Sequence, residues 1–367
     1  MHRRAPERLA ELDLLRFVAA LAVVAFHYLV AFKSVWGEQP AELFPAVAPL
    51  AGLGILGVEL FFMISGFVIL MSAWGRGLGA FARSRFVRLY PAYWLSLAVA
   101  FGLYGVLALK GPDPKLTGAE YALNATMFQR LFKGIDAIGV YWSLWAELRF
   151  YLIMVVMILI GITHNRILIL GGVWLTAATG ALFLDNPVVN EIVMPAYAPY
   201  FVAGMSLYLI HRRGSAWLPW LYVAAGYALA LNAALERVER RVKAAGQAAM
   251  PVTDLGVILT VTAIFVVMAL VAIGLLRTRP NRLLTALGGT TYPLYLFHSA
   301  AAVVLVPLLT RGLPPWLTAL LTTLAAILVS YLVYACVERP IQRLLRPRRP
   351  SRTPATDPSQ AEKASVP

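Results

Sequence analysis

Ten apolar stretches of 18 to 25 residues recur along almost the whole chain. A helix needs about 20 apolar residues to cross the ~30 Å hydrocarbon core of a bilayer, and it satisfies its own backbone hydrogen bonds there. The pattern therefore predicts an all-α fold, a polytopic transmembrane helix bundle of about ten spans. The predicted spans are 12–33, 52–73, 89–109, 140–160, 166–184, 193–210, 216–233, 252–276, 284–306 and 316–337.

The composition agrees with a membrane protein. Hydrophobic residues make up 60% of the 367 residues and charged residues 14%, whereas about a quarter of a soluble protein is charged. The single cysteine, Cys336, excludes an intramolecular disulfide. We expect one transmembrane domain over residues 1–340, followed by a disordered, basic, Pro-rich cytoplasmic tail over residues 341–367.

The basic residues of the connections predict the orientation. With the N-terminus inside, the inner segments hold twenty Lys and Arg residues and the outer segments ten. The positive-inside rule then puts both termini in the cytoplasm of a multi-pass protein of the plasma (inner) membrane. The net charge of +14 is thereby assigned to topology and to membrane lipids, with no nucleic-acid partner expected. The exception is ERVERRVKAAG, residues 236–246, a basic amphipathic piece that this topology places outside. The Ala-, Arg- and Leu-rich composition suggests a bacterial source.

Two ionisable residues lie deep in the first span. Arg16 and His27 are eleven positions apart, so they fall on one helix face, separated by about 16 Å along the axis. Ionisable side chains inside a membrane are costly and face a bundle interior or an aqueous path. The alternative is a snorkelling Arg16 and an isolated core His27, but their shared stripe favours function.

Three further ionisable residues lie at a similar depth to His27. Glu59 lies in GVELFFMISGF, Glu147 in YWSLWAELRFYLI and His298 in YPLYLFH. Counting about 1.5 Å per residue from the start of each span places all three, together with His27, in the outer third of the membrane. A cationic inner part and an outer part of imidazoles and carboxylates are therefore predicted.

The motif RFVRLYPAYW carries two arginines at the inner interface. Arg85 and Arg88 share a helix face at i, i+3, and Tyr90 follows them in an aromatic belt. One interpretation is simple positive-inside anchoring. The other is a phosphate clamp, because the planar guanidinium binds phosphate oxygens in a bidentate way.

These motifs, with VERP at residues 337–340, occur in order over nearly the whole chain. Together they resemble the integral-membrane acyltransferase 3 family, which transfers acyl groups to sugars and related hydroxyls. The resemblance implies acyl-CoA, with acetyl-CoA expected, as a cytoplasmic co-substrate rather than a bound cofactor. It also implies a catalytic His27 with Arg16 as its motif partner, donor binding by Arg85 and Arg88, and a functional Glu147.

The chemistry of acyl transfer fits these residue types. A hydroxyl acceptor, such as a sugar or glycoside, needs a base near pKa 7, which His27 can be, with His298 in reserve. A carboxylate, Glu59 or Glu147, would orient the imidazole. The remaining candidates, including hydroxyl donors to a developing oxyanion, are Trp142, Ser143, Tyr151, Tyr292 and Tyr295. We expect no metal, because the sequence shows no cluster of metal ligands.

A multi-pass transporter is the alternative, since buried Arg, Glu and His also line transport pathways. The sequence shows no internal repeat of the kind common in transporters. It leaves open the acyl chain, the acceptor, the side of the membrane on which the acceptor is acylated, a covalent or direct route, and the oligomeric state.

Overall fold

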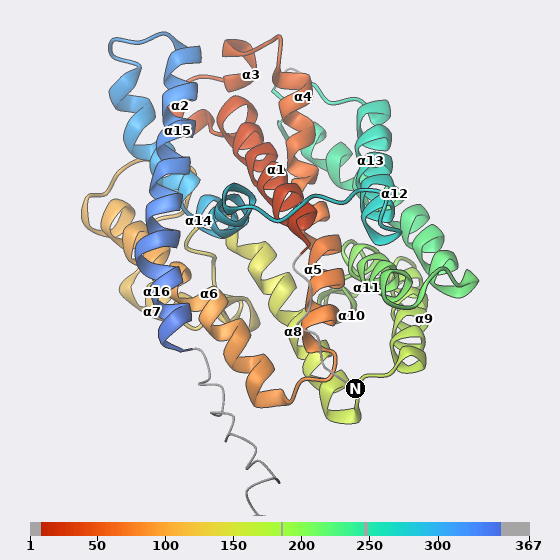
Figure 1. Cartoon of the computed structure of the whole chain (residues 1–367). Coiled ribbons are helices and arrows are strands. Elements are labelled where there is room, and N and C mark those ends of the chain that lie inside the picture. Colours follow the sequence, from red (N-terminus) through yellow and green to blue (C-terminus); the bar gives the residue numbers. More distant parts are fainter. Residues whose placement is uncertain (1–8, 185, 246–248, 346–367) are drawn as a thin grey trace, which may run out of the picture.

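The computed structural model describes residues 9–184, 186–245 and 249–345. Regular structure in this part of the chain is entirely helical, and its helices form one bundle (Figure 1). The helices are α1 (Ala10–Phe26), η1 (His27–Ala31), α2 (Lys33–Trp36), α3 (Pro40–Leu43), α4 (Ala48–Leu53), η2 (Gly54–Leu56), α5 (Gly57–Ala73), α6 (Leu78–Ala100), η3 (Phe101–Val106), α7 (Gly118–Asn124), η4 (Gln129–Phe132), α8 (Tyr141–Ile160), α9 (His164–Ala181), α10 (Pro187–Val193), α11 (Ala198–Arg213), α12 (Trp217–Ala245), α13 (Asp254–Ala272), α14 (Arg282–Leu309), α15 (Pro315–Val333), η5 (Tyr334–Glu338) and α16 (Arg339–Leu344).

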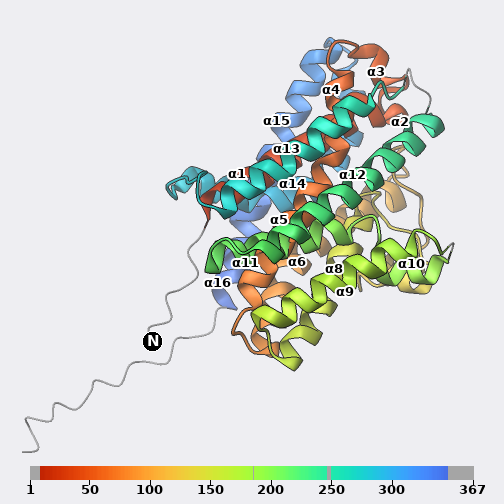
Figure 2. The ribbon, with the colours of Figure 1, turned by 90° about the vertical axis from the view of Figure 1, so that its right-hand side faces the viewer.

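The predicted helix bundle is confirmed. Within the described residues, nine helices are long and apolar enough to cross a membrane, and each corresponds to one predicted span. The remaining predicted span, 166–184, forms α9, which packs beside α11 and α12 (Figure 2). This helix falls short of the other nine because its first turn carries His164, Asn165 and Arg166.

The first and last helices meet at one end of the bundle. Asp13 of α1 and Arg343 of α16 line the same cavity. The described beginning of α1 and α16 therefore lie at the same end of the bundle. We call this end the basic end and the opposite one, with the long segment 107–140, the loop end.

Two helix boundaries differ from the sequence expectation. Helix α6 begins at Leu78, eleven residues before the predicted span, so Arg85 and Arg88 lie within the helix rather than before it. Helix α12 continues to Ala245, so the amphipathic piece is the end of a helix and not a separate surface segment. Apolar length marks where a helix enters hydrocarbon, whereas propensity carries the helix further.

The predicted tail lies outside the described residues except for residues 341–345. The expected domain boundary at residue 340 falls inside α16, which runs to Leu344.

Glycines allow the central helices to approach closely. A Cβ at Gly66 of α5 would come within 2.3 Å of the Phe201 carbonyl oxygen on α11, and one at Gly204 of α11 within 2.1 Å of the Met63 oxygen on α5. Gly54 makes the same kind of approach to Ala22 of α1. Small residues at helix contacts are how membrane helices pack without a hydrophobic driving force between them. Helix α5 thereby holds α1 and α11 against its two sides.

Segment 107–140 folds back along α6 instead of projecting from the bundle. The Tyr93 hydroxyl donates to the Asn124 carbonyl at 2.7 Å, and the Tyr90 hydroxyl donates to Thr126 at 2.9 Å. As a result α8 begins beside the last third of α6, where the hydroxyls of Tyr141 and Ser96 lie 2.6 Å apart. At the loop end of α8, its neighbours are therefore residues of segment 107–140 and of α1 and α14.

The orientation of the two ends is a testable prediction. In a Cys336→Ser background, we expect Lys115→Cys at the loop end to react with a membrane-impermeant maleimide added to intact cells. Arg76→Cys, at the basic end, should react only after the cells are permeabilised, because the basic end is cytoplasmic by the positive-inside rule. Both native side chains are exposed. Labelling of Arg76→Cys in intact cells would reverse the orientation.

Candidate functional site

The two membrane histidines, far apart in sequence, lie in contact. His27 begins the π-helical turn η1 at the end of α1, and His298 lies in the middle of α14. Their ring centroids are 4.9 Å apart, and His298 Nε2 lies 3.3 Å from His27 Nδ1. π-Helical turns often mark functional positions.

The hydrogen bonds assign the tautomers of the pair. His27 Nδ1 lies 2.8 Å from the Val23 carbonyl oxygen, and His298 Nδ1 lies 3.2 Å from that of Leu294. A carbonyl only accepts, so each Nδ1 carries a proton in the neutral ring. His298 Nε2 is then an acceptor facing His27 Nδ1–H. The remaining nitrogen, His27 Nε2, is left as an unprotonated base.

A cavity of about 250 Å³, the histidine cavity, opens beside His27. His298, by contrast, is fully buried. The polar side chains that line the cavity come from five segments of the chain, and they are His27, Asp113, Trp142, Arg237, Arg241, Tyr295 and Ser299. Of the two imidazoles, His27 is thus the one that can meet a substrate.

Asp113 is a cavity residue that the sequence analysis missed. Its Oδ2 accepts hydrogen bonds from Ser299 at 2.6 Å and Tyr104 at 2.9 Å, and its Oδ1 accepts one from the Gly139 N–H at 2.7 Å. Burial raises the pKa of the Asp113 carboxyl, and these hydrogen bonds oppose the rise. The sequence KGPDPK reads as an ordinary turn, so no local signal marks this residue.

Glu59 forms a buried ion pair instead of contacting a histidine. Its carboxylate bonds to Arg237 of α12, and the two side chains are only 2% and 13% exposed. The Arg237 guanidinium also lies 5.3 Å from the centre of the Trp142 ring. The sequence analysis could not find this partner because it placed residues 236–246 outside the membrane.

Glu147 also lies away from the histidines. It accepts hydrogen bonds from Tyr151 at 2.8 Å and from Ser65 at 3.0 Å. The structure therefore brings neither predicted carboxylate to His27, and among the described residues the other imidazole occupies that place.

A narrow cavity of about 70 Å³, which we call the throat, adjoins the histidine cavity on the side of the basic end. Tyr295 lines both cavities, and its hydroxyl lies 2.6 Å from that of Ser143. The other polar residues of the throat are Arg16, Ser65, Arg88, Glu147, Thr291 and Tyr292. The volume leaves room for only a few water molecules.

A large cavity of about 1320 Å³, the basic cavity, continues from the throat. Arg16, Arg88 and Tyr292 line both. Its ionisable residues are six arginines and two carboxylates, namely Arg16, Arg76, Arg88, Arg282, Arg339, Arg343, Asp13 and Glu338. The excess of guanidinium groups makes the electrostatic potential of this cavity positive, which would favour an anion.

The predicted arginine clamp divides into two different environments. Arg88 lines the throat and the basic cavity, whereas Arg85 packs between the rings of Phe81 and Tyr151, 5.7 and 5.8 Å from their centres. Tyr90 points toward segment 107–140 and stacks on Phe86, away from the basic cavity. Arg88 alone of these three residues is placed to meet a ligand in the basic cavity.

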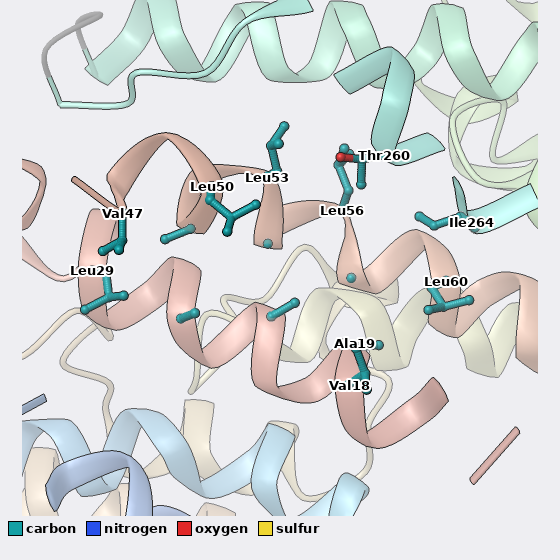
Figure 3. A pocket seen from close by; sticks show the side chains of 15 residues that line it. Val18, Ala19, Leu29, Val47, Leu50, Leu53, Leu56, Leu60, Thr260 and Ile264 are labelled. Atoms are coloured by element: carbon teal, nitrogen blue, oxygen red, sulfur yellow. The ribbon is translucent and has the colours of Figure 1, made fainter. Parts of the chain in front are cut away.

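An apolar groove of about 370 Å³ lies between α1, α4 and α13 (Figure 3). It has Thr260 as its one hydroxyl side chain and no ionisable lining residue. It therefore offers no acid, base or charge, and the candidate site is the line of cavities that contains the histidines.

The Glu59–Arg237 pair generates a stability prediction. Arg237→Leu should destabilise the protein by about 3–5 kcal/mol, because it leaves a buried carboxylate without its counter-charge. Glu59→Leu should do the same, and the double variant should recover most of the loss. Thermal unfolding in detergent measures this. The control is Arg240→Leu on the same helix, whose side chain is 70% exposed and which should change stability by less than about 1 kcal/mol. Additive losses in the double variant would contradict the pairing.

Comparison with known proteins identifies relatives of part of the chain. Over 122 residues, 31% of this chain and 56% of the relative, the chain is 37% identical to "Protein 2 in picA locus" of Rhizobium radiobacter. Over 114 residues, 31% of this chain and 27% of the relative, it is 33% identical to "Acyltransferase MdmB" of Streptomyces mycarofaciens. The chain thus spans about half the length of the first relative and a quarter of the second.

No solved structure matches the chain. A family model described as an acyltransferase domain, that of the acyltransferase 3 family, matches residues 9–335, which include both histidines, the throat and most of the basic cavity. The chain belongs to this family of acyltransferases.

Proposed function

We propose that the protein is an O-acyltransferase of the bacterial plasma membrane. It moves an acyl group, acetyl in our proposal, from cytoplasmic acyl-CoA to a hydroxyl of a sugar or glycosylated acceptor. The observation that carries the proposal is the contact between the two imidazoles at the wall of a cavity, and the tautomers inferred above leave His27 Nε2 free to act as the base.

The basic cavity supports CoA as the donor. CoA is a polyanion at one end and a thioester at the end of a long thin arm. Its phosphates match the arginine-lined basic cavity, and its arm matches the throat, which leads to His27. Arg16 and His27, about 16 Å apart along one helix, lie near the two ends of this path.

The histidine cavity favours a short acyl group. The acyl end of the donor enters it first, with the CoA arm in the throat behind. The acyl group must then share a space of about 250 Å³ with the acceptor hydroxyl, and acetyl, the smallest common acyl group of CoA, leaves the most room.

The imidazole pair supports general base catalysis. His27 Nε2 takes the proton of the acceptor hydroxyl while the oxygen of that hydroxyl attacks the carbonyl carbon of the thioester. The imidazolium that forms keeps its Nδ1–H between the Val23 carbonyl and His298 Nε2, two acceptors that stabilise the charge. The C–S bond then breaks, and the proton passes from His27 to the CoA thiolate.

His298 in this mechanism is a positioning residue that replaces the carboxylate of a triad. Tyr295 lines both the throat and the histidine cavity, and its hydroxyl, which donates to the Val140 carbonyl at 3.1 Å, would turn to donate to the developing oxyanion. Arg241 lines the same cavity and adds positive charge there, whereas the charge of Arg237 is balanced by Glu59.

The base assignment predicts a large loss on substitution. His27→Ala should reduce transfer from radiolabelled acetyl-CoA by about 10²–10⁴-fold, the usual contribution of a general base, with membrane abundance unchanged. His298→Ala should reduce kcat less, because the base remains and only its orientation and charge stabilisation are lost. A His27→Ala variant more active than His298→Ala would move the base to His298.

The donor site predicts different effects for the two arginines of α6. Losing a charge-assisted contact costs about 1.5–3 kcal/mol, so Arg88→Ala should raise the KM for acetyl-CoA roughly tenfold to a hundredfold. Arg88→Lys should recover only part of that affinity, because it keeps the charge without the guanidinium fork.

The matched control is Arg85→Lys, which lies three residues earlier on the same helix but lines neither cavity. It should leave the KM for acetyl-CoA within about twofold, although its ring contacts can affect stability. If Arg88→Lys and wild type had equal KM values for acetyl-CoA, Arg88 would set the orientation of the protein in the membrane and would not bind the donor.

A further inference from the structure

A further polar cavity lies at the loop end, and it is not part of the path proposed for the donor. It has a volume of about 490 Å³, within the range of small-molecule sites, and we call it the loop cavity. Its lining comes from segment 107–140 and from α10, and consists of Pro114, Arg130, Lys133, Gly134, Ile135, Asp136, Gly139 and Glu191.

The loop cavity meets the histidine cavity at one residue. Gly139 lines both cavities, while Asp113 lines the histidine cavity and its neighbour Pro114 the loop cavity. The Gly139 N–H donates to Asp113 Oδ1, and a Cβ at Gly139 would meet that same oxygen at 3.4 Å. Gly139, which has no side chain, and the carboxylate of Asp113 therefore form the boundary between the two cavities.

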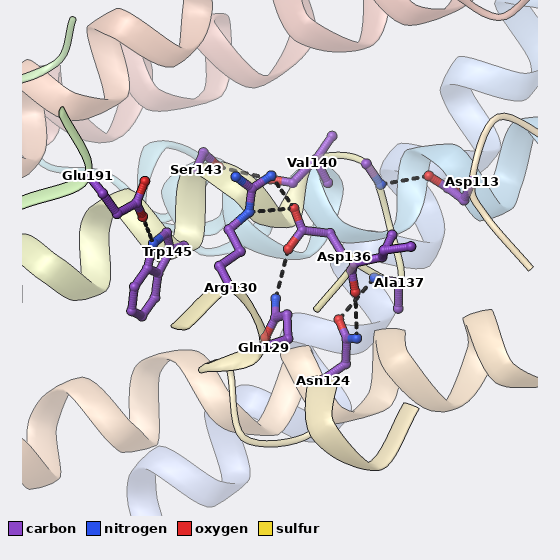
Figure 4. A network of polar contacts seen from close by, with 12 residues as sticks. Asp113, Asn124, Gln129, Arg130, Asp136, Ala137, Val140, Ser143, Trp145 and Glu191 are labelled. Atoms are coloured by element: carbon purple, nitrogen blue, oxygen red, sulfur yellow. Dashed lines mark hydrogen bonds and ion pairs between the residues drawn. The ribbon is translucent and has the colours of Figure 1, made fainter. Parts of the chain in front are cut away.

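The walls of the loop cavity are held by their own hydrogen bonds (Figure 4). The Asp136 carboxylate accepts hydrogen bonds from Gln129 Nε2 at 2.9 Å and from Arg130 Nε at 2.8 Å. The Ala137 N–H donates to Asn124 Oδ1 at 2.9 Å. Glu191 is held by Arg149 at 3.1 Å. These contacts keep the cavity preorganised, which lowers the entropic cost of binding a ligand.

Charge separates the two ends of the path. Two cations and two carboxylates line the loop cavity, so its charge is balanced, whereas arginines dominate the basic cavity. A polyanion is favoured at the basic end. An uncharged ligand with many hydroxyl groups suits the loop cavity, because cationic side chains there can donate hydrogen bonds and carboxylates can accept them.

Asp113 has capacity for one more hydrogen bond. A carboxylate has about four acceptor positions, of which Ser299, Tyr104 and Gly139 occupy three. The remaining position is on Oδ1, at the boundary between the loop cavity and the cavity of His27.

We propose that the loop cavity binds the acceptor, an uncharged polyol such as a sugar ring, and that Asp113 accepts a hydrogen bond from one of its hydroxyls. The acceptor thereby presents a neighbouring hydroxyl to His27 from the loop end. This inference rests on the proposed function and adds to it the acceptor's site and the side from which it enters.

The test measures the two substrates separately. Purified protein in nanodiscs is given acetyl-CoA and a panel of methyl glycosides, and the glycoside that wild type acetylates fastest is used throughout. Asp113→Asn should raise the KM for that glycoside roughly tenfold to a hundredfold, the value of a hydrogen bond to a charged group, with the KM for acetyl-CoA unchanged.

Gly139→Ala keeps the test independent of any folding defect in Asp113→Asn. Its Cβ makes an ordinary contact with Asp113 and so should be tolerated, yet it narrows the boundary and should raise the glycoside KM. The matched control is Asp254→Asn, an exposed carboxylate at the start of α13 that lines neither cavity and should behave as wild type.

The outcomes distinguish this inference from the proposed function. If wild type transferred no acetyl group from acetyl-CoA to any glycoside, the proposed function would fall and this inference with it. If wild type transferred normally while both Asp113→Asn and Gly139→Ala kept its glycoside KM, the acceptor site alone would be overturned. Parallel rises in both KM values would likewise overturn it, since they indicate a structural role.

Discussion

A charged side chain in hydrocarbon must find a partner or a polar cavity, and this requirement organises the whole bundle. Glu59 and Arg237 satisfy it by pairing, and Arg16 and Arg88 satisfy it by lining a cavity. Close contacts at Gly66 and Gly204 bring α5 and α11 together. The polar groups line a row of neighbouring cavities that share lining residues, namely the basic cavity, the throat and the histidine cavity, and the order of these cavities gives the candidate site its polarity.

Much of the fold was predictable, because long apolar runs leave a chain few alternatives in a membrane. The ten predicted spans correspond to helices, and the i, i+11 stripe correctly put Arg16 and His27 on one polar face lining successive cavities. Helix ends were less predictable. The start of α6 at Leu78 and the extension of α12 through Arg237 depend on polar residues that continue a helix beyond its apolar part.

Contacts between distant segments were not predictable from one sequence. A local motif shows that His298 is buried in a span but not that its ring meets His27, which lies on a different helix. The same holds for Glu59 and Arg237. Asp113 is harder still, because it reaches the site only through the return of segment 107–140 along α6. Its sequence neighbourhood gives an ordinary turn, and its chemistry comes entirely from tertiary structure.

The narrowness of the throat also determines whether protons and cations can leak across the membrane through the protein. A polar path that joins two sides of a membrane would let protons and cations flow down their gradients if it filled with continuous water. The throat holds only a few waters, and the guanidinium groups of Arg16 and Arg88 border it. Fixed positive charge in a constriction repels cations and protons, as it does in water-selective pores. In the proposed function, the same two arginines that meet the anionic donor therefore also act as an electrostatic seal, which preserves the membrane potential across the row of cavities.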